Sequence, residues 1–298
     1  MKSAKLFQSG QALVLVLLSL AVVLTLVLFV LSRSVTDVAI SSREEEAVRA
    51  FSAAEAGVEK SLIVGTGFSL TDIGDASFKV DISSLAENSS GFTYPISLNS
   101  GETSSLWFVA HDADGNIVCN AETPCFTGRT LKVCWGRSGT PSGNATTPAV
   151  ELSVFYTTTP GDYSTVRIAR GVYDPNTGRR LLNSFESPDG GTCTIGDQSF
   201  EFQKTIDLST LGIPAGSYGS QAGLQVAHIR FFYNTDLAHQ VGYDVNFGGN
   251  SLLPSQGLVV DSSGEAGQST RRLAVFQAWP EAPTVFGYSV YSSSGLTQ

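Results

Sequence analysis

Residues 12–31, ALVLVLLSLAVVLTLVLFVL, form a nearly unbroken apolar run. Ser19 and Thr25 are its polar members, and in a helix both hydroxyls can bond to a carbonyl one turn earlier. About 20 apolar residues suffice for a helix to cross the hydrocarbon core of a membrane. Lys2 and Lys5 precede the run, so the positive-inside rule predicts a cytoplasmic N-terminus and a body outside. The segment therefore predicts a single-pass membrane anchor.

The helical pattern continues beyond the apolar run. Residues 35–63 contain no proline and a single glycine, Gly57. Arg43 to Glu46 form a polar collar, after which apolar residues recur at helical spacing. We expect one helix over residues 11–63, membrane-spanning at 12–31 and amphipathic at 33–63. The second apolar stripe consists of Ala47, Phe51, Ala54, Val58 and Leu62.

Composition narrows the function classes. The chain has 298 residues, of which 15% are charged, and its formal net charge is -9. An acidic chain has little with which to neutralise phosphates, so we expect no nucleic-acid partner. Three histidines leave little material for a metal site or for general-base chemistry, and no cysteine pair has the CxxC spacing of a zinc site. We expect no metal and no cofactor.

Three consecutive features carry a family resemblance. They are Ser9-Gly10-Gln11, the apolar run, and REEEAVRAFSAAEAGVEKSL at residues 43–62. Together they resemble the N-terminus of type IV pilin-like proteins, more narrowly the PilX-type minor pilins and the K-type pseudopilins of type II secretion. AAEAG at Ala53–Gly57 is characteristic of the PilX-type subgroup. The resemblance covers residues 1–63, about a fifth of the chain.

The resemblance implies processing and assembly. A prepilin peptidase would remove the basic leader, residues 1–10, by cutting between Gly10 and Gln11, and Gln11 would become the methylated N-terminus. The partners would be the membrane, the peptidase and other pilin-like subunits, which pack helix against helix in a filament. The packing residues would be Leu15, Ala47, Phe51, Ala54, Val58 and Leu62. Family members usually have phenylalanine or methionine first and glutamate fifth, where this chain has Gln11 and Leu15.

Beyond residue 63 the sequence becomes rich in Gly, Ser and Thr, with apolar residues alternating between turn clusters. This pattern is typical of an antiparallel sandwich or barrel, so the predicted fold class is α+β. We expect residues 64–98 and 221–298 to form a pilin-like sheet, and residues 99–220 to form an inserted β-sandwich. The expected strands are 78–82, 92–98, 106–110, 131–135, 150–157, 165–173, 200–208, 224–233, 241–247, 271–279 and 284–291.

Four cysteines lie in the expected sandwich: Cys119, Cys125, Cys134 and Cys193. An even number in an exported domain favours two disulfides, and the sequence allows three pairings. We favour Cys119 with Cys125 across a short loop, and Cys134 with Cys193 across the sandwich.

Two acidic segments invite a functional interpretation. Asp112, Asp114 and Asn116 match the first ligand positions of a calcium loop, but the later positions do not fit, and a hairpin turn is the better interpretation. Asp174, Asn176 and Gly178 likewise predict a turn. No nucleophile elbow surrounds a serine, and no histidine lies in a catalytic motif, so we expect no enzyme.

These observations favour a low-copy minor pilin or pseudopilin, at the tip or initiating end of a type IV pilus or type II secretion-like filament. It would be parked in the cell membrane before assembly and would display its β domain outside, toward a surface or a carbohydrate. Two alternatives remain. One is an uncleaved single-pass adhesin or envelope protein, and the other is a tethered hydrolase, which needs a cleft with convergent carboxylates.

Overall fold

The computed structural model describes residues 9–281, so the strand expected at 284–291 lies outside the described residues. The fold is α+β, with one long apolar N-terminal helix followed by antiparallel sheets. The chain forms two compact units. Unit 1 comprises residues up to Asp81 together with Val260–Val275, and unit 2 comprises Ile82–Val259 together with the chain from Phe276 onward.

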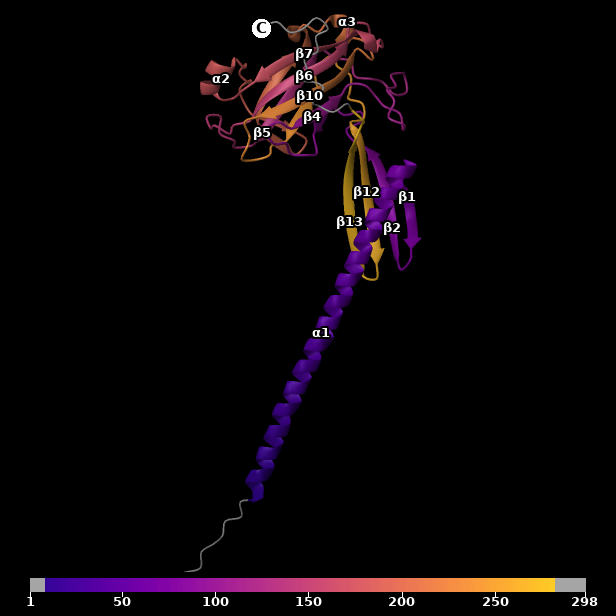
Figure 1. The fold of residues 1–298 in the computed structure, drawn as a ribbon, viewed down its shortest axis with the longest axis vertical. Helices are drawn as coiled ribbons and strands as arrows, with labels where there is room; N and C mark the ends of the chain where they lie inside the picture. Colours follow the sequence, from indigo (N-terminus) through magenta and orange to yellow (C-terminus); the bar gives the residue numbers. More distant parts are fainter. Residues whose placement is uncertain (1–8, 282–298) are drawn as a thin grey trace, which may run out of the picture. The chain divides into compact units, whose positions relative to one another are not determined.

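Helix α1 runs from Ser9 to Val64 without interruption, as Figure 1 shows. Its 56 residues span roughly 84 Å at 1.5 Å per residue. Leucine, alanine and charged residues with good helical propensity fill it, and it contains no proline. The helix ends at Gly65, whose φ of 74° is left-handed and whose N–H donates to the Ser61 carbonyl at 2.8 Å. A glycine in this conformation is a common helix terminator.

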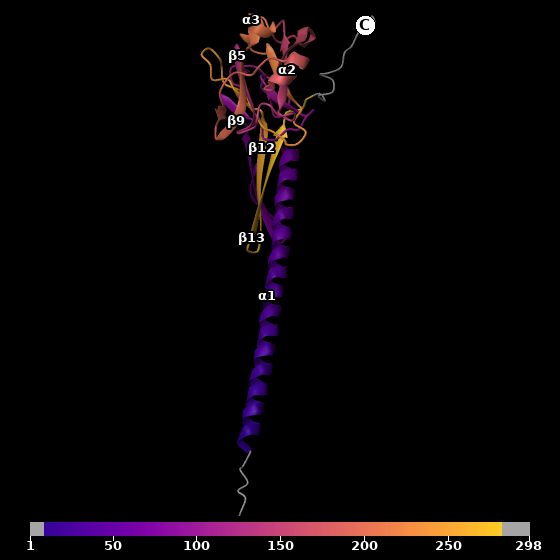
Figure 2. The ribbon, with the colours of Figure 1, turned by 90° about the vertical axis from the view of Figure 1, so that its left-hand side faces the viewer.

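A four-stranded sheet lies beside the C-terminal half of α1 (Figures 1 and 2). Its strand order is β1-β2-β12-β13. The strands are β1 (Phe68–Ile73), β2 (Ala76–Ser84), β12 (Gly257–Ala266) and β13 (Ser269–Ala278). Gly74 and Gly267 have φ of 60° and 57°, which suits the tight turns of the β1–β2 and β12–β13 hairpins.

The two faces of this sheet differ in chemistry because side chains alternate along each strand. Phe78, Val80 and Val260 are buried. The other side carries exposed ion pairs, in which Lys79 lies 2.9 Å from Asp81 and the Arg272 guanidinium donates to both oxygens of Asp261. Ion pairs in water contribute little stability, so the buried side holds this sheet on the helix.

The helix face that meets the sheet is built from small residues. Its buried members, spaced by one helical turn, are Ala50, Ala53, Ala54, Gly57, Val58 and Ser61. A methyl group built on Gly57 would lie 2.5 Å from Ser262 Oγ and 2.9 Å from a Phe78 ring carbon. A methyl group on Gly264 of β12 would collide with the backbone of Ala50. Glycines at both points therefore allow the helix and the sheet to approach closely.

Unit 2 is a sandwich of two antiparallel sheets, with strand orders β4-β10-β6-β7 and β3-β11-β5-β9-β8. The strands of the first sheet are β4 (Thr103–Trp107), β10 (Leu224–Phe232), β6 (Ala149–Thr157) and β7 (Val166–Tyr173). Those of the second are β3 (Gly91–Thr93), β11 (Val241–Asp244), β5 (Thr130–Arg137), β9 (Gln198–Asp207) and β8 (Cys193–Ile195). Short helices connect them: η1 (Tyr163–Thr165), α2 (Thr177–Asn183), η2 (Leu208–Leu211) and α3 (Ala215–Tyr218).

The two sheets of unit 2 share one apolar core. Trp135 of β5 is fully buried, and its indole N–H donates to the Pro148 carbonyl at 3.0 Å. A buried polar contact also joins the sheets, because the hydroxyls of Ser104 on β4 and Tyr243 on β11 lie 2.6 Å apart. Burial raises the pKa of Tyr243, so its phenol stays protonated and can donate.

The division of the strands between sheets differs from the sequence expectation. Strands β3, β10 and β11 lie in 64–98 and 221–298, which we had assigned to the helix-packed sheet, yet they belong to the sandwich. Conversely, β1, β8 and β12 were not expected as strands. Alternation identifies a strand but not its partner, and β12 reads GLVVDSSGEA, whose Ser and Gly resemble a turn.

We predict that Gly264→Val destabilises the packing of α1 on the sheet by about 1–3 kcal/mol, because overpacking forces the neighbouring backbone apart. Ser263→Val is the matched control, since it adds the same side chain to the same strand at a position that is not fully buried. Thermal unfolding of the detergent-solubilised full chain measures both. Equal melting temperatures for the two variants would show that the close approach is not required.

Candidate functional site

The N-terminal half of α1 exposes apolar side chains all around the helix. From Leu13 to Leu31 every residue is exposed, and Leu15 is 62% accessible. Ser19 donates to the Val16 carbonyl at 2.9 Å and Thr25 to the Val22 carbonyl at 2.8 Å, so both hydroxyls are satisfied within the helix. The helix is long and apolar enough to cross a membrane. Its backbone and hydroxyl groups present no unpaired polar atom to hydrocarbon there.

The proposed cleavage junction lies at the start of this helix. Because α1 begins at Ser9, Gly10 and Gln11 are in its first turn. The leader residues Lys2 and Lys5 lie outside the described residues. The junction and the apolar run therefore belong to one continuous element.

The expected packing stripe on the second half of α1 is divided between two environments. Ala54 and Val58 are buried against the sheet of unit 1, Ala47 is half-buried, and Phe51 and Leu62 are exposed at 42% and 39%. At 100° per residue the sheet-facing side is centred roughly 70° away from the expected stripe. The expected stripe follows the apolar spacing that includes Phe51 and Leu62, whereas the sheet packs on an adjacent side of the helix made mostly of small residues. These residues therefore do not form a single free face.

The polar collar of α1 contains a contact that sequence reasoning missed. Glu46 accepts a hydrogen bond at 3.0 Å from the N–H of Gln268, in the turn between β12 and β13. Its carboxylate lies where a side chain on Gly267 would be, so that turn closes directly over it. No local signal connects residues 222 positions apart in the sequence.

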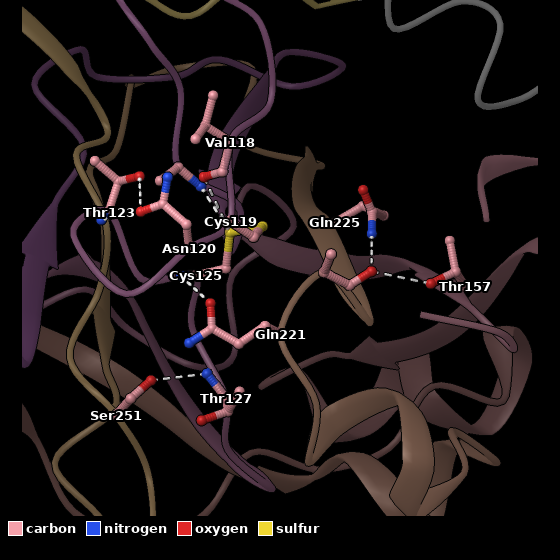
Figure 3. The surroundings of a disulfide bond; sticks show 12 residues. Val118, Cys119, Asn120, Thr123, Cys125, Thr127, Thr157, Gln221, Gln225 and Ser251 are labelled. Atoms are coloured by element: carbon pink, nitrogen blue, oxygen red, sulfur yellow. Dashed lines mark hydrogen bonds between the residues drawn. A yellow bond between two sulfur atoms is a disulfide. The ribbon is translucent and has the colours of Figure 1, made fainter. Parts of the chain in front are cut away.

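Both disulfides form with the pairing that we favoured. Cys119 joins Cys125, and Cys134 joins Cys193. Figure 3 shows the surroundings of the Cys119–Cys125 disulfide. Beside it, the Cys125 N–H donates to the Gln221 side chain at 2.9 Å. The intervening loop is ordered by Asn120, whose Oδ1 accepts from the backbone N–H groups of Glu122 and Thr123.

The second disulfide holds a different position from the expected one. Cys134 lies on β5 and Cys193 on β8, and both strands belong to the five-stranded sheet. The bond therefore joins strands within one sheet and does not cross the sandwich. It packs with Ile195 and Phe200 in a small buried cluster. Its effect is to hold the three-residue edge strand β8 in place.

A serine on β4 and a histidine on β10 both contact a glutamate that follows β13. Ser105 Oγ donates to Glu281 Oε2 at 2.6 Å, and His228 Nε2 lies 3.2 Å from the same oxygen. Burial favours a raised pKa for Glu281, but these two contacts outweigh it and lower the pKa. Ser105 and His228 therefore both contact the Glu281 carboxylate. Ser105 makes no hydrogen bond to the His228 imidazole, which would be needed to activate its hydroxyl as a nucleophile.

The other two histidines, His111 and His239, also make packing or hydrogen-bond contacts within the fold. Burial lowers the pKa of His111 to about 4, and its ring stacks on Trp279. Burial likewise lowers the pKa of His239, whose Nδ1 accepts from the Arg137 N–H at 3.0 Å. Over residues 9–281, no group of three His, Cys, Asp or Glu side chains could hold a metal ion.

The acidic segments at Asp112 and Asp174 are structural. Asp112 Oδ1 accepts from the N–H groups of Asp114 and Asn116, which closes a hairpin turn and lowers the Asp112 pKa. Asp174 is fully buried and pairs with Arg179 at 2.7 Å. The turn expected after it is helix α2, which Asn176 caps through the N–H of Gly178.

A small polar hollow of about 280 Å³ lies beside the loop that follows β5. Its lining includes Arg137, Thr140, Asn144 and one carboxylate, Asp236, which accepts from the Thr146 hydroxyl at 2.9 Å. Hydrolysis of a glycosidic bond needs two carboxylates that face each other across the bond. This hollow has one carboxylate, that of Asp236, and this carboxylate already accepts the hydrogen bond from Thr146.

No family model, no curated protein and no solved structure matches the chain. Function is therefore inferred from the residues and contacts described above.

We predict that Cys134→Ala with Cys193→Ala lowers the free energy of unfolding by about 2–5 kcal/mol, because the unfolded chain loses a long closed loop. The matched control is Cys119→Ala with Cys125→Ala. Its loop closes over a sequence separation of 6 instead of 59, so the loss should be smaller. Urea unfolding followed by tryptophan fluorescence measures both. A larger loss in the control pair would contradict the loop-entropy explanation.

Proposed function

We propose that this chain is a minor pilin or pseudopilin, a low-copy subunit of a type IV pilus or type II secretion-like filament. The observation that carries the proposal is that the two halves of α1 have different surroundings. Its first half exposes apolar side chains on every side, and its second half carries the folded sheet of unit 1. A helix of this kind can lie in a bilayer and later pack against other helices, because the bilayer and a helix bundle both accept the same apolar surface.

The AAEAG motif gains a physical role that supports the proposal. Ala53, Ala54 and Gly57 are buried where β2 and β12 approach the helix, while Glu55 is exposed. A subunit that leaves the membrane needs its folded domain fixed to the helix, since a loose attachment would not carry the domain into a filament. The small residues provide that attachment, because they allow close van der Waals contact along the helix.

In the proposed topology, the N-terminus is cytoplasmic, and the sheet of unit 1 and the whole of unit 2 lie outside the membrane. Lys2 and Lys5 support this orientation by the positive-inside rule, and the two disulfides suit an oxidising compartment. The sandwich would then be the displayed part, facing a surface or a carbohydrate. Other pilin-like subunits would contact the exposed part of α1.

Leu15 supports a position at the tip. Where family members have glutamate at the fifth mature position, the carboxylate would neutralise the amine of a neighbouring subunit inside an apolar bundle. A buried charge without its partner is expensive, so this pair would control which subunit can follow which. A subunit with Leu15 offers no carboxylate to a neighbour's amine and places no ionised side chain at this position. It suits the end of the filament, where no further subunit needs it.

Processing is the first test. We expect co-expression with a prepilin peptidase to give a mature protein that begins at Gln11, as measured by intact mass and N-terminal sequencing. Gly10→Asp should block the cut, whereas Ser9→Ala, which retains the glycine, should not. Native protein that keeps residues 1–10 would favour the uncleaved single-pass adhesin or envelope protein instead.

Copy number and position are the second test. We expect trace stoichiometry in purified filaments by quantitative mass spectrometry, with gold label at the filament ends. Leu15→Glu should shift the label into the shaft, because the new carboxylate can pair with a neighbour's amine. Leu15→Met, which conserves the volume, should leave the label at the ends. A wild-type protein labelled along the whole filament would refute the tip assignment.

A further inference from the structure

A second polar hollow adjoins the one described above, at the same rim of the sandwich. Its volume is about 320 Å³, and its lining includes Gln198 at the start of β9 and Gln240 just before β11. The first hollow, of about 280 Å³, is lined by the loop after β5 and by Asp236. Arg137 and Ser138 line both hollows. The two hollows therefore meet along this short stretch of chain.

The loop between β5 and β6, which lines the first hollow, is held by hydrogen bonds. The Arg137 N–H donates to His239 Nδ1 at 3.0 Å, and the Thr140 hydroxyl donates back to the Arg137 carbonyl at 2.6 Å. The Gly139 N–H donates to the Glu201 carboxylate on β9 at 2.7 Å. A ligand would meet a preformed surface, so binding would not carry the entropy cost of ordering this loop.

Several polar side chains that line the hollows have no hydrogen-bond partner within residues 9–281. The Arg137 guanidinium makes neither an ion pair nor a hydrogen bond in this part of the chain. The same holds there for the side-chain amides of Asn144, Gln198 and Gln240. A bound molecule can therefore use these groups without breaking a contact of the fold.

The first hollow also contains a buried donor and an accessible acceptor. His239 is 2% exposed, and burial lowers its pKa, so its imidazole is neutral near pH 7. Because Nδ1 accepts from the Arg137 N–H, the ring proton is on Nε2, which is therefore a donor. The acceptor is Asp236, which is exposed and uses one carboxylate oxygen for the Thr146 hydroxyl. Its other oxygen has no partner within residues 9–281.

The charges around the hollows are nearly balanced. Among the described residues, Arg137 is the one cation and Asp236 the one anion that line them. Glu201 adds a second carboxylate beside the loop. Arg179 also reaches this loop, but it is paired with Asp174 at 2.7 Å. An anionic ligand would therefore meet two carboxylates against a single unpaired guanidinium, and the site favours a neutral one.

Mixed donors and acceptors with little net charge match a carbohydrate. A sugar hydroxyl both donates and accepts, so it can bond to an amide, a guanidinium or a carboxylate. A peptide would need a free strand edge or pockets for its apolar side chains. The apolar side chains that line these hollows are Pro141, Leu237 and Phe200, which suffice for the C–H face of a sugar ring. Ligand sites usually measure about 300–1,000 Å³, so the two hollows together have room for a small oligosaccharide.

We propose that the rim where these two hollows meet is a carbohydrate-binding site, which takes a neutral oligosaccharide with one sugar ring in each hollow. Asn144 and Asp236 bind the ring in the first hollow, Gln198 and Gln240 bind the ring in the second, and Arg137 reaches both. The inference rests on the proposed function only for the outward position of the sandwich. Binding by the purified protein and cleavage before Gln11 are measured separately, so either can fail without the other.

A glycan array tests the class of ligand. The full chain is solubilised in lauryldimethylamine oxide, a detergent without a sugar headgroup that could compete, and is applied to neutral, sialylated and sulfated oligosaccharides. We expect binding to neutral oligosaccharides and weaker binding to sulfated counterparts, because an added anion meets Asp236 and Glu201. Binding to none of them, to acidic ones alone, or to a parallel array of peptides instead would overturn the proposal.

Arg137→Met tests the location of the site. The variant keeps most of the aliphatic chain and removes a guanidinium that makes no bond within residues 9–281, so the fold should be retained. We expect it to weaken binding of the best array oligosaccharide about tenfold or more, as measured by isothermal titration calorimetry. Arg167→Met is the matched control, since Arg167 is exposed on β7 and lines neither hollow. Equal affinities for wild type and a folded Arg137→Met variant would overturn the proposal.

A pair of further variants tests whether both hollows are occupied. Asn144→Leu removes an amide from the first hollow and Gln198→Leu removes one from the second. We expect each to weaken binding of the same oligosaccharide severalfold in calorimetry, because each ring loses a hydrogen-bond partner. A loss in one variant alone would confine the ligand to one hollow and refute the two-ring assignment.

Discussion

Helix α1 and strand β12 approach each other so closely that only hydrogen fits at Gly57 and Gly264. This steric constraint organises unit 1. Dispersion attraction falls steeply with distance, so a helix face of small residues gains from a partner that can lie almost on its backbone. Because β12 is central in the sheet order β1-β2-β12-β13, its position determines where the neighbouring strands can lie. The Glu46 contact to the turn after β12 then fixes that hairpin along the helix axis.

The sequence was most informative where a property is local. The sequence predicted α1 almost to its observed ends, because its apolar run is uninterrupted, its residues are good helix formers and it contains no proline. The hydrogen bonds from the Ser19 and Thr25 hydroxyls to carbonyls one turn earlier also followed from the helix alone. The four cysteines predicted two disulfides for a similar reason. The sequence was least informative about contacts between distant residues. The small-residue face of α1 carries a weak hydrophobic signal, and its meaning depends on Gly264, about 200 positions further along the chain.

The sandwich shows the same limit in its polar residues. Ser104 and Tyr243 meet between the sheets, and Asp174 is fully buried beneath α2, yet neither position is distinguishable from a surface residue in the sequence. Buried polar groups are tolerated where each finds a partner, and here the partners come from distant strands or from Arg179. Burial on both faces of β6 and β10 was likewise invisible to a search for alternation. The sequence could thus identify the apolar helix, but it could not identify how the strands of the sandwich are arranged.

The hairpin of β12 and β13 has a consequence for the order of folding. A chain is synthesised from its N-terminus, so the small-residue face of α1 exists long before its covering strand does. Residues 82–259 are synthesised in between, and they make up most of unit 2, which has its own core. Within that unit, Leu85 and Gly257 are already joined by a backbone hydrogen bond of 2.9 Å. Folding of the sandwich therefore brings the end of β2 to the start of β12 and closes the long loop between them. With those strand ends held together, the pairing of β2 with β12 would carry a loop-closure cost like that between neighbours in sequence.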